Sequence, residues 1–408
     1  MPPYLAALYH MRSLAATLFT LAACAHAGTW TIIASKIGGG PLGVSCYEDG
    51  LTCITAVSQI LPAGYEAKRS ADGGATWATV PDADLFIFAL YNSAVFGEFA
   101  VISGMEFIQK SSNKGLNFTQ VPGSLAIGGG EIVRKVLGPS GAPIGFAILG
   151  LSNDGNSNGL VVSLNNVAGP WAEKNIPALN AGVIATDGAF FAGDWIVAGE
   201  EFETQRQRRL GSSRGGRRGR GARAAKATYA TQVVRSGDGG ATWQQLYYNA
   251  TVATLGLACA SPKNCVLVQE DADFAYIQTT TDGFATVATT LVDAAEGAAL
   301  VEASVDGAGC FVVVGGAVSG GGQSSASYHS CDQGLTWEAD ELANFPFDLL
   351  FTDIDCGAGV NASCWATLCA SNDGAGNRRP PGHPLTLLLF HSTPSHSLYL
   401  SMQGTTRG

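Results

Sequence analysis

The sequence predicts an all-β protein, a β-propeller with seven four-stranded blades joined by recurring hairpin turns. An eight-residue motif recurs along the chain, and a short apolar strand precedes each copy. The composition agrees with this prediction, because 53 of the 408 residues are Gly, 46% are hydrophobic and only 14% are charged. Such a composition is typical of short buried strands separated by tight turns. After the N-terminus, no long stretch has the apolar spacing of an amphipathic helix.

The recurring motif has the pattern S-x-D-x-G-x-T-W. It is complete at 70–77, 236–243 and 330–337, weaker at 111–118, 280–287 and 163–171, and weakest at 392–399. Asp and Ser side chains bond backbone N–H groups in turns, Gly permits positive φ, and the closing Trp buries a large ring between hairpins. We therefore predict a structural role for the motif positions of the complete copies, which are Ser70, Asp72, Gly74, Thr76, Trp77, Ser236, Asp238, Gly240, Thr242, Trp243, Ser330, Asp332, Gly334, Thr336 and Trp337.

The apolar strands supply a second, independent period. Successive strands start 46, 47, 49, 70, 45 and 54 residues apart. The interval of 70 contains a basic insert, and without its roughly 22 residues it falls to about 48, close to the usual blade period. A single blade cannot bury both of its faces, so the blades are expected to pack in a ring. The strands start at Cys53, Phe99, Phe146, Trp195, Cys265, Cys310 and Cys364.

Closing such a ring requires a strand from one end of the chain to complete the last blade. Two segments qualify, Trp30–Ala34 and the tail Leu398–Gln403, and the sequence does not choose between them. The repeat fits most of residues 30–371, whereas 372–384 and the tail fit it poorly. We treat residues 28–408 as a single propeller domain.

Positive charge is concentrated in one insert. Residues 205–227 hold eight Arg, one Lys and no acidic residue, within the fourth predicted blade. This Gly/Arg-rich composition cannot form a core, so we predict a disordered loop. Without these nine positive charges the chain has 14 basic against 33 acidic residues, a net charge of −19. An acidic body of this kind is not expected to bind nucleic acid.

The N-terminus has the features of a secretory signal peptide. Met11 and Arg12 precede the apolar run Leu14–Cys24, and Ala25-His26-Ala27 forms an A-x-A cleavage site. The apolar run is too short to span a bilayer, and no later segment is long enough. We therefore predict that residues 1–27 are removed and that the remainder is an exported protein without a transmembrane segment, expected to be a monomer.

Cysteine spacing and sequons agree with export. Three close pairs are candidate disulfides in an oxidising compartment: Cys46 with Cys53, Cys259 with Cys265, and Cys356 with Cys364. Three further cysteines remain, Cys310, Cys331 and Cys369. Two of them can pair, and one free thiol is then left. The candidate glycosylation sites, each in an N-x-S/T sequon, are Asn117, Asn249 and Asn361.

Neither a metal nor a cofactor is expected. No cysteine pair has C-x-x-C spacing, and no histidine lies near a pair. The histidines after the signal segment are interpreted as surface or tail residues: His329, His383, His391 and His396. The glycine runs 38–40 and 320–322 lack the Lys-Ser/Thr and the helix that a phosphate-binding loop requires, so they are predicted to be ordinary loops.

The motif resembles the Asp-box, or BNR repeat, of three groups of propellers. It is similar to that of sialidases, of xyloglucan-active glycoside hydrolases and of seven-bladed photosystem II assembly-factor-like proteins. The last group is nearest in size and in the form of the motif, and the resemblance implies a binding scaffold. In these proteins the box lies at the blade periphery, away from the ligand-binding face. The motif is specific for architecture and weak for activity.

The sequence tests each activity that the resemblance implies. Sialidases hold a carboxylate with three arginines and carry an Arg-Ile-Pro motif, and this chain has no such motif. Arg69 and Arg235 precede box serines, so a convergent triad with Arg134 is not expected. Xyloglucan-active enzymes use paired carboxylates between two propellers, whereas this chain has the length for one. Acids that follow apolar strands are candidates for such a pair: Glu200, Glu201, Asp271 and Asp273.

These observations lead to a hypothesis with two alternatives. The chain is interpreted as a secreted, non-catalytic propeller that binds a glycan or a protein through its funnel face. The first alternative is a glycoside hydrolase, sialidase-like or xyloglucanase-like, acting in the funnel, for which no catalytic residue is assigned. The second alternative is a photosystem II assembly-factor-like scaffold, although the N-terminus lacks the composition of a transit peptide.

Overall fold

The computed structural model describes residues 29–34, 40–59, 64–81, 90–104, 107–121, 127–152, 158–180, 183–203, 228–271, 274–293, 298–306, 308–319, 322–340, 349–356, 364–370 and 388–393. The predicted signal peptide at 1–27 and the basic insert at 205–227 lie outside these residues. So do Asn361, His383 and His396. Every regular element in the described part of the chain is a β-strand, which gives the all-β class that the sequence predicts.

Four of the sheets take their four strands consecutively from the chain, each strand antiparallel to the next. The first contains β2 (Gly40–Cys46), β3 (Cys53–Gln59), β4 (Gly64–Ser70) and β5 (Ala78–Thr79). The second contains β6 (Leu90–Phe96), β7 (Phe99–Gly104), β8 (Phe107–Ser111) and β9 (Thr119–Gln120). The others contain β18 (Ala253–Ser261), β19 (Asn264–Glu270), β20 (Ala275–Thr280) and β21 (Ala288–Asp293), and β22 (Ala298–Val305), β23 (Phe311–Ser319), β24 (Gly322–Ser330) and β25 (Glu338–Ala339).

One sheet has eight strands and consists of two antiparallel halves. The halves meet where β10 pairs with β14 in parallel, through Val136 with Phe190 and Leu137 with Phe191. The first half contains β10 (Ile127–Leu137), β11 (Pro143–Ser152), β12 (Asn158–Ser163) and β13 (Ala172–Asn175). The second half contains β14 (Val183–Phe191), β15 (Asp194–Glu203), β16 (Thr228–Ser236) and β17 (Gln244–Asn249).

The remaining sheet joins the two ends of the chain. Its strand order is β1-β28-β27-β26, with β26 at Leu349–Cys356, β27 at Cys364–Ala370, β28 at Leu388–Thr393 and β1 at Thr29–Ala34. Strand β1 lies outermost and pairs antiparallel with β28. The segment Trp30–Ala34 therefore provides the strand that ring closure requires, and the alternative tail Leu398–Gln403 lies outside the described residues.

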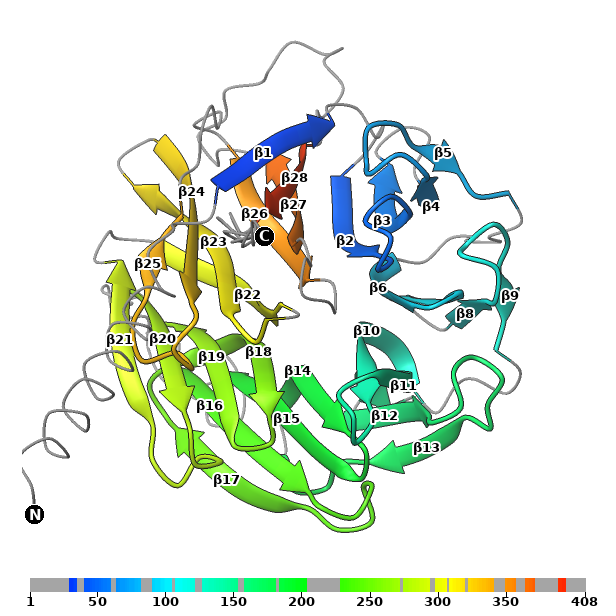
Figure 1. The fold of residues 1–408 in the computed structure, drawn as a ribbon. Coiled ribbons are helices and arrows are strands. Elements are labelled where there is room, and N and C mark those ends of the chain that lie inside the picture. The colour runs from blue at the N-terminus through cyan, green and yellow to red at the C-terminus, as the bar shows by residue number, and fades with distance from the viewer. Residues whose placement is uncertain are drawn as a thin grey trace, which may run out of the picture.

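The sheets are arranged around a central axis as in a propeller (Figure 1). Strands β2, β6, β10, β14, β18, β22 and β26 lie nearest the axis, and all of them contribute residues to one axial cavity. The apolar strands identified from the sequence are the second strands of each run of four, β3, β7, β11, β15, β19, β23 and β27. Their registers bury rows of apolar side chains between neighbouring sheets, because no sheet can bury both of its faces alone.

The motif turns are held by side-chain hydrogen bonds to the backbone. In the copy at 236–243, Asp238 Oδ1 accepts from the Thr242 N–H at 2.8 Å, and Oδ2 accepts from the Thr242 hydroxyl at 2.6 Å. Ser236 Oγ accepts from the Gly240 N–H at 2.7 Å. The copies at 70–77 and 330–337 repeat these contacts, and Asp282 makes them in a weaker copy. These bonds fold each turn back on itself, and the side chains involved have no free group directed at the axis.

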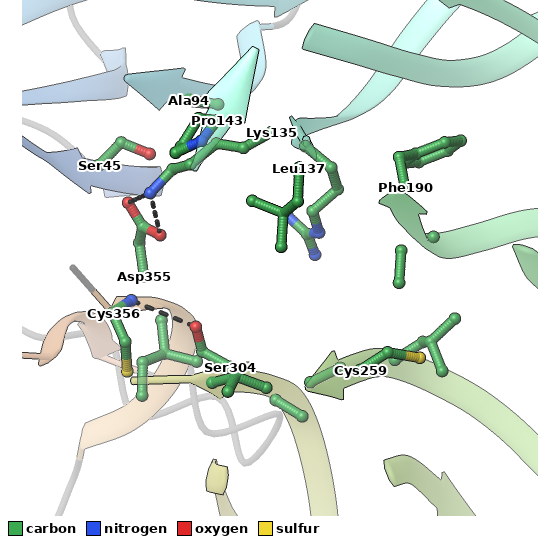
Figure 2. A pocket seen from close by; sticks show the side chains of 18 of the residues that line it. Ser45, Ala94, Lys135, Leu137, Pro143, Phe190, Cys259, Ser304, Asp355 and Cys356 are labelled. Atoms are coloured by element: carbon green, nitrogen blue, oxygen red, sulfur yellow. Dashed lines mark hydrogen bonds and ion pairs between the residues drawn. The ribbon is translucent and has the colours of Figure 1, made fainter. Parts of the chain in front are cut away.

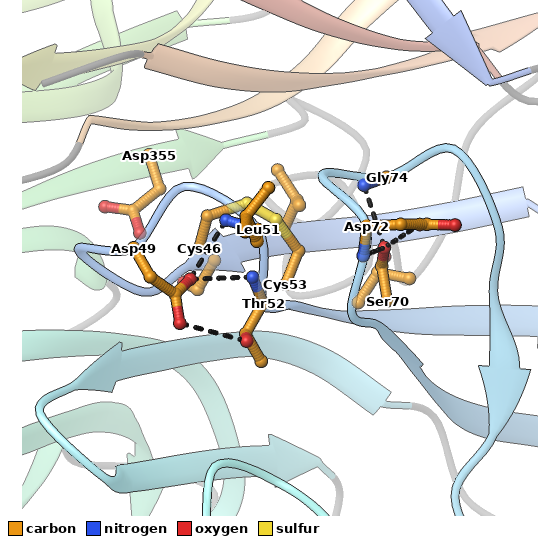
Figure 3. The surroundings of a disulfide bond; sticks show 12 residues. Cys46, Asp49, Leu51, Thr52, Cys53, Ser70, Asp72, Gly74 and Asp355 are labelled. Atoms are coloured by element: carbon orange, nitrogen blue, oxygen red, sulfur yellow. Dashed lines mark hydrogen bonds between the residues drawn. A yellow bond between two sulfur atoms is a disulfide. The ribbon is translucent and has the colours of Figure 1, made fainter.

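Four disulfides lie at the same end of the sheets as the motif turns. They join Cys46 to Cys53, Cys259 to Cys265, Cys356 to Cys364, and Cys310 to Cys331. The first three each link the innermost strand to the second strand of one sheet, and the fourth links a hairpin to a motif turn. Beside Cys53, Asp49 holds the β2–β3 turn by accepting from the N–H groups of Leu51 and Thr52 at 2.9 and 2.7 Å (Figure 3).

Trp195 is the largest fully buried side chain among the described residues. Its ring packs edge-on against Phe190 at 6.1 Å and lies 6.3 Å from the ring of Trp243, the closing residue of the motif. Gly240 of that motif has φ +81°, and a Cβ at this position would overlap the Trp195 ring. The motif glycine is therefore required both by the turn conformation and by the packed tryptophan.

We predict that Gly240→Ala destabilises the protein by at least about 2 kcal/mol, because it combines a left-handed backbone with overpacking. Gly237 in the same turn is the matched control, since no atom lies within 4 Å of a Cβ built there. Gly237→Ala is expected to change the stability by less than about 0.5 kcal/mol. Urea unfolding of both variants measures the difference, and equal effects would contradict the packing argument.

Candidate functional site

The axial cavity has a volume of about 460 Å³ and is lined by residues from β2, β6, β10, β14, β18, β22 and β26 (Figure 2). Its lining includes Ser140 and Gly141 of the β10–β11 turn and Gly309 of the β22–β23 turn. The cavity therefore lies at the end of the axis that carries these hairpins. The motif turns share this end, as the bond from the Gly239 N–H to the Gly193 carbonyl at 3.1 Å shows, whereas the resemblance to Asp-box proteins implies a ligand-binding face away from the motif.

The cavity wall is apolar on one side and polar on the other. Leu137 of β10 and Phe190 of β14 lie on the side away from Asp355 (Figure 2), although the Phe190 ring itself is buried in the core. Phe191 of β14 and Pro143 at the start of β11 add to the apolar lining. The opposite side carries Asp353 and Asp355 of β26. A wall divided in this way suits a ligand with one apolar and one polar part.

An ion pair spans the polar side of the cavity. Lys135 Nζ of β10 lies 3.1 and 3.3 Å from the two carboxylate oxygens of Asp355, and the side chains are 17% and 18% exposed. The pair therefore remains accessible from the cavity (Figure 2). The neighbouring Ser304 hydroxyl accepts from the Cys356 N–H at 3.2 Å, and the Ser45 hydroxyl donates to the Ser93 carbonyl at 2.7 Å.

A buried charge cluster lies beside the cavity. Arg134 Nε of β10 contacts Asp187 Oδ1 of β14 at 2.8 Å, and its Nη2 contacts Glu302 Oε2 of β22 at 3.0 Å. The Asp187 and Glu302 side chains are 0% and 11% exposed. Glu302 also hydrogen-bonds to Asp187. One guanidinium thus holds two carboxyl groups from different sheets, and the contact between them requires a shared proton.

Two of the carboxylates bind backbone N–H groups of the neighbouring run of strands. Asp187 Oδ2 accepts from the Leu257 N–H of β18 at 2.7 Å, and Asp353 Oδ2 accepts from the Val44 N–H of β2 at 2.8 Å. The second bond connects the last sheet to the first. Each innermost strand has a bulge against its second strand at this level, and the residues that follow the bulges are Gly43, Asn92, Ile132, Asp187, Gly256, Glu302 and Asp353.

Burial changes the protonation of the cluster. Burial raises the pKa of Glu302 well above its ordinary value, and the nearby Asp187 and Asp353 raise it further against the effect of Arg134. Burial also raises the pKa of Asp353 to about 7, although Arg134 and the Val44 N–H oppose this shift. For Arg134, burial opposes the charged form, but Asp187 and Glu302 outweigh it and hold the pKa above its ordinary value. Burial therefore favours the protonated form of Glu302, in agreement with the proton that its contact with Asp187 requires.

The carboxylates of the cavity wall are occupied by partners within the protein. Asp355 binds Lys135, Asp353 binds the Val44 N–H, and Asp306 accepts from the N–H groups of Ala308 and Cys310, each at 2.9 Å. Because Glu302 and Asp187 contact each other directly, they leave no space for a glycosidic bond or water between them. An inverting or retaining carboxyl pair requires a separation of roughly 5–9.5 Å.

Of the acids proposed from the sequence, those that the structure describes follow or lie on second strands. Glu200 and Glu201 lie on β15, the second strand of its run, and pair with Ile184 and Val183 of β14. Strands β15 and β19 are therefore not the innermost strands that a carboxyl pair across the funnel would require. Asp271 binds the Phe274 N–H and the Tyr276 hydroxyl at 2.8 and 2.7 Å, and Asp273 lies outside the described residues.

The other residues singled out from the sequence are also dispersed. Arg69 Nε donates to the Lys114 carbonyl at 2.7 Å, and Arg235 pairs with Asp194 at 2.5 Å, so neither joins Arg134 at the axis. His329 lies on β24, and its Nδ1 contacts Asp340 at 2.7 Å. His391 lies on β28. Within the described part of the chain, no three His, Cys, Asp or Glu side chains are grouped as a metal site would require. Nor does this part contain a helix long and apolar enough to cross a membrane.

Sequence reasoning missed the residues of the axis. Three of the runs contain a polar residue among mostly apolar ones, shortly before the second strand. These residues are Asp187, Glu302 and Asp353, which lie 8, 9 and 11 residues before Trp195, Phe311 and Cys364, respectively. A polar residue at this recurring place in the repeat was the available signal. The sequence alone does not show where the preceding loop ends and the first strand of each run begins, and this hides the signal.

We predict that Arg134→Met destabilises the protein by about 3–5 kcal/mol at pH 7, since it leaves a buried charge without its partner. The loss is expected to shrink at pH 5, where the remaining carboxyl groups take up protons. Arg134→Lys retains a positive charge and is the control, with a smaller loss. Urea unfolding at both pH values measures the effect, and an identical loss at pH 5 would exclude the electrostatic explanation.

We also predict that the melting temperature falls as the pH rises from 5 to 8. Because burial raises the pKa of Asp353 to about 7, the folded protein retains a proton that the unfolded chain loses above about pH 4. Stability therefore falls as the pH rises from 5 to about 7, between the two pKa values, and levels off above 7. Asp353→Asn is expected to flatten the profile, while Glu173→Gln on the exposed strand β13 leaves it unchanged. Calorimetry across the window provides the comparison.

Comparison with known proteins supports the architecture. No protein-family profile and no curated protein sequence matches the chain. Solved structures do match: YCF48 bound to D1 peptide has a TM-score of 0.53 and 12% identity, covering 88% of this chain and 96% of that one. YCF48 from Cyanidioschyzon merolae has a TM-score of 0.50 and 15% identity, covering 89% of this chain and 98% of its own.

A glycoside hydrolase matches in the same manner. An ancestral GH74 enzyme has a TM-score of 0.52 and 12% identity, and the match covers 86% of this chain. The chain spans only 47% of the length of that enzyme. At these identities the similarity concerns the fold alone. The sheet arrangement and these matches together show that the chain has the β-propeller fold shared by the YCF48 and GH74 proteins.

Proposed function

We propose that the chain is a seven-bladed propeller scaffold that binds a protein or glycan ligand and performs no catalysis. The blade count follows if the eight-stranded sheet is divided at its junction of only two residue pairs, Val136 with Phe190 and Leu137 with Phe191. Each resulting blade then contributes one strand to the cavity. The main support for a binding role is this cavity, whose wall joins residues of every innermost strand.

The occupied carboxylates support binding over hydrolysis. A catalytic acid or base requires a side chain that is free to exchange a proton with substrate. Asp306, Asp353 and Asp355 are instead committed to backbone N–H groups or to Lys135, so their interactions serve structure. The hydrolase alternative rests on one observation, the raised pKa of buried Glu302 beside Asp187. Their direct contact argues against it.

A protein ligand receives support from the comparison. The YCF48 structure is described as bound to a D1 peptide, and its fold covers most of this chain. The photosystem II assembly-factor-like alternative would also require the same binding partner. None of the described residues of this chain supports that partner. We therefore retain only the general property, a propeller that holds a segment of another macromolecule.

We propose export through the secretory pathway, with residues 1–27 as the signal peptide. Four disulfides support an oxidising compartment, because such bonds are rare where thiols are kept reduced. Glycosylation is proposed at two sequons. Asn117 is exposed in a motif turn, and Asn249 is half-buried with its Oδ1 accepting from the Thr251 hydroxyl at 2.7 Å. We expect a monomer with Gly28 as its first residue.

We predict binding without turnover. Purified protein is applied in parallel to peptide and glycan arrays, and the same preparation is incubated with sialosides and xyloglucan. The expected result is retention on an array with no released sugar. Sugar release that is abolished by Glu302→Gln would overturn the scaffold proposal in favour of the hydrolase. If the protein binds no peptide and no glycan on either array, the scaffold proposal is also contradicted.

A further inference from the structure

The mouth of the axial cavity has an excess of negative charge. Its two cations are already engaged, Lys135 by Asp355 and Arg134 by Asp187 and Glu302, which share a proton. Among the residues that the structure describes, this leaves Asp306 on the wall without a cation in contact, while Asp353, whose pKa burial raises to about 7, carries part of a charge. His329 acts on Asp306 through space, but its Nδ1 is bound to Asp340 at 2.7 Å. A cationic ligand would compensate this excess, whereas an anionic one would add to it.

The apolar side of the cavity sets a second requirement. Leu137 lies across the cavity from Asp355 (Figure 2), and Pro143 and Phe191 add apolar lining, whereas the Phe190 ring is buried in the core. A small hydrated cation would leave this apolar lining uncovered. Lysine and arginine side chains have an aliphatic stem that packs on apolar surface and a charged end that keeps its polar contacts.

We infer that the cavity mouth binds a basic side chain, arginine or lysine, presented by a segment of a partner polypeptide. This inference rests on the proposed scaffold function and gives it a site and a ligand chemistry. The volume of about 460 Å³ accommodates such a side chain with adjoining backbone. Neutral and acidic glycans lack the cation, so among the two proposed ligand types the cavity favours a polypeptide. In this proposal the stem lies against Leu137, and the charged end reaches Asp355, whose side chain is accessible from the cavity.

The ion pair between Lys135 and Asp355 allows a test with opposite signs. Asp355→Asn removes the negative charge and leaves Lys135 uncompensated, so it opposes a cationic ligand. Lys135→Met keeps the length of the side chain, removes the competing cation and frees Asp355 for the ligand. A purely structural effect on the cavity would weaken binding in both variants. Glu173→Gln on exposed β13 removes the same charge far from the cavity and is the matched control.

The probes are acetylated and amidated pentapeptides of sequence Gly-Leu-X-Leu-Gly, in which X is arginine, lysine, citrulline or glutamate. Isothermal titration calorimetry of the purified chain is expected to show binding for arginine and lysine only, because citrulline has the shape of arginine without its charge. Asp355→Asn is expected to weaken arginine-peptide binding roughly tenfold, Lys135→Met to strengthen it severalfold, and Glu173→Gln to leave it unchanged.

Each other outcome counts against the inference. Equal binding of the citrulline and arginine peptides, or a change in the same direction for Asp355→Asn and Lys135→Met, places the site elsewhere. No binding by any pentapeptide also overturns the cavity assignment. If the protein still binds members of the peptide or glycan arrays in that case, the scaffold proposal stands and only the site is wrong. Melting temperatures of the variants identify any loss caused by unfolding.

Discussion

In every sheet except the eight-stranded one, the innermost strand has one edge without a partner strand, and the rest of the structure depends on how that edge is satisfied. Buried backbone N–H groups require an acceptor. Asp187 and Asp353 provide it by accepting from Leu257 and Val44 of the next run of strands. These bonds connect neighbouring sheets at the axis, and the bond to Val44 does so where the chain closes on itself. Carboxylates are therefore drawn into the centre of the fold.

Collecting carboxylates on the axis creates an electrostatic problem that a single guanidinium resolves. Arg134 contacts both Asp187 and Glu302, and the remaining excess is relieved by a proton held on Glu302. Burial without a countercharge is too costly for further ionised groups. The same balance leaves the cavity mouth short of positive charge. The acidity of the mouth thus follows from how the ring is held together.

The fold was predictable because its signal repeats. Trp77, Trp243 and Trp337 close turns of the same pattern, and Phe99 and Cys364 start strands at nearly constant intervals. The accessible ion pair of the cavity was not predictable in this way, since Lys135 and Asp355 belong to no recurring motif, unlike the polar residues that follow the bulges. Lys135 and Asp355 are separated by 220 positions, and no local pattern connects them. Acids such as Glu200 were placed wrongly because sequence spacing gives the order of strands but not their distance from the axis.

The contrast between periphery and axis indicates where function resides in this chain. At the periphery, Asp72, Asp238 and Asp332 make nearly the same bonds, so changes there alter stability in the same way in each copy. At the axis, equivalent positions after the bulges differ in chemistry, from Gly43 to Glu302. A repeat that preserves its turns while varying its axial residues keeps its architecture and changes what the cavity recognises. In the proposed scaffold function, recognition is therefore assigned to the positions that break the repeat.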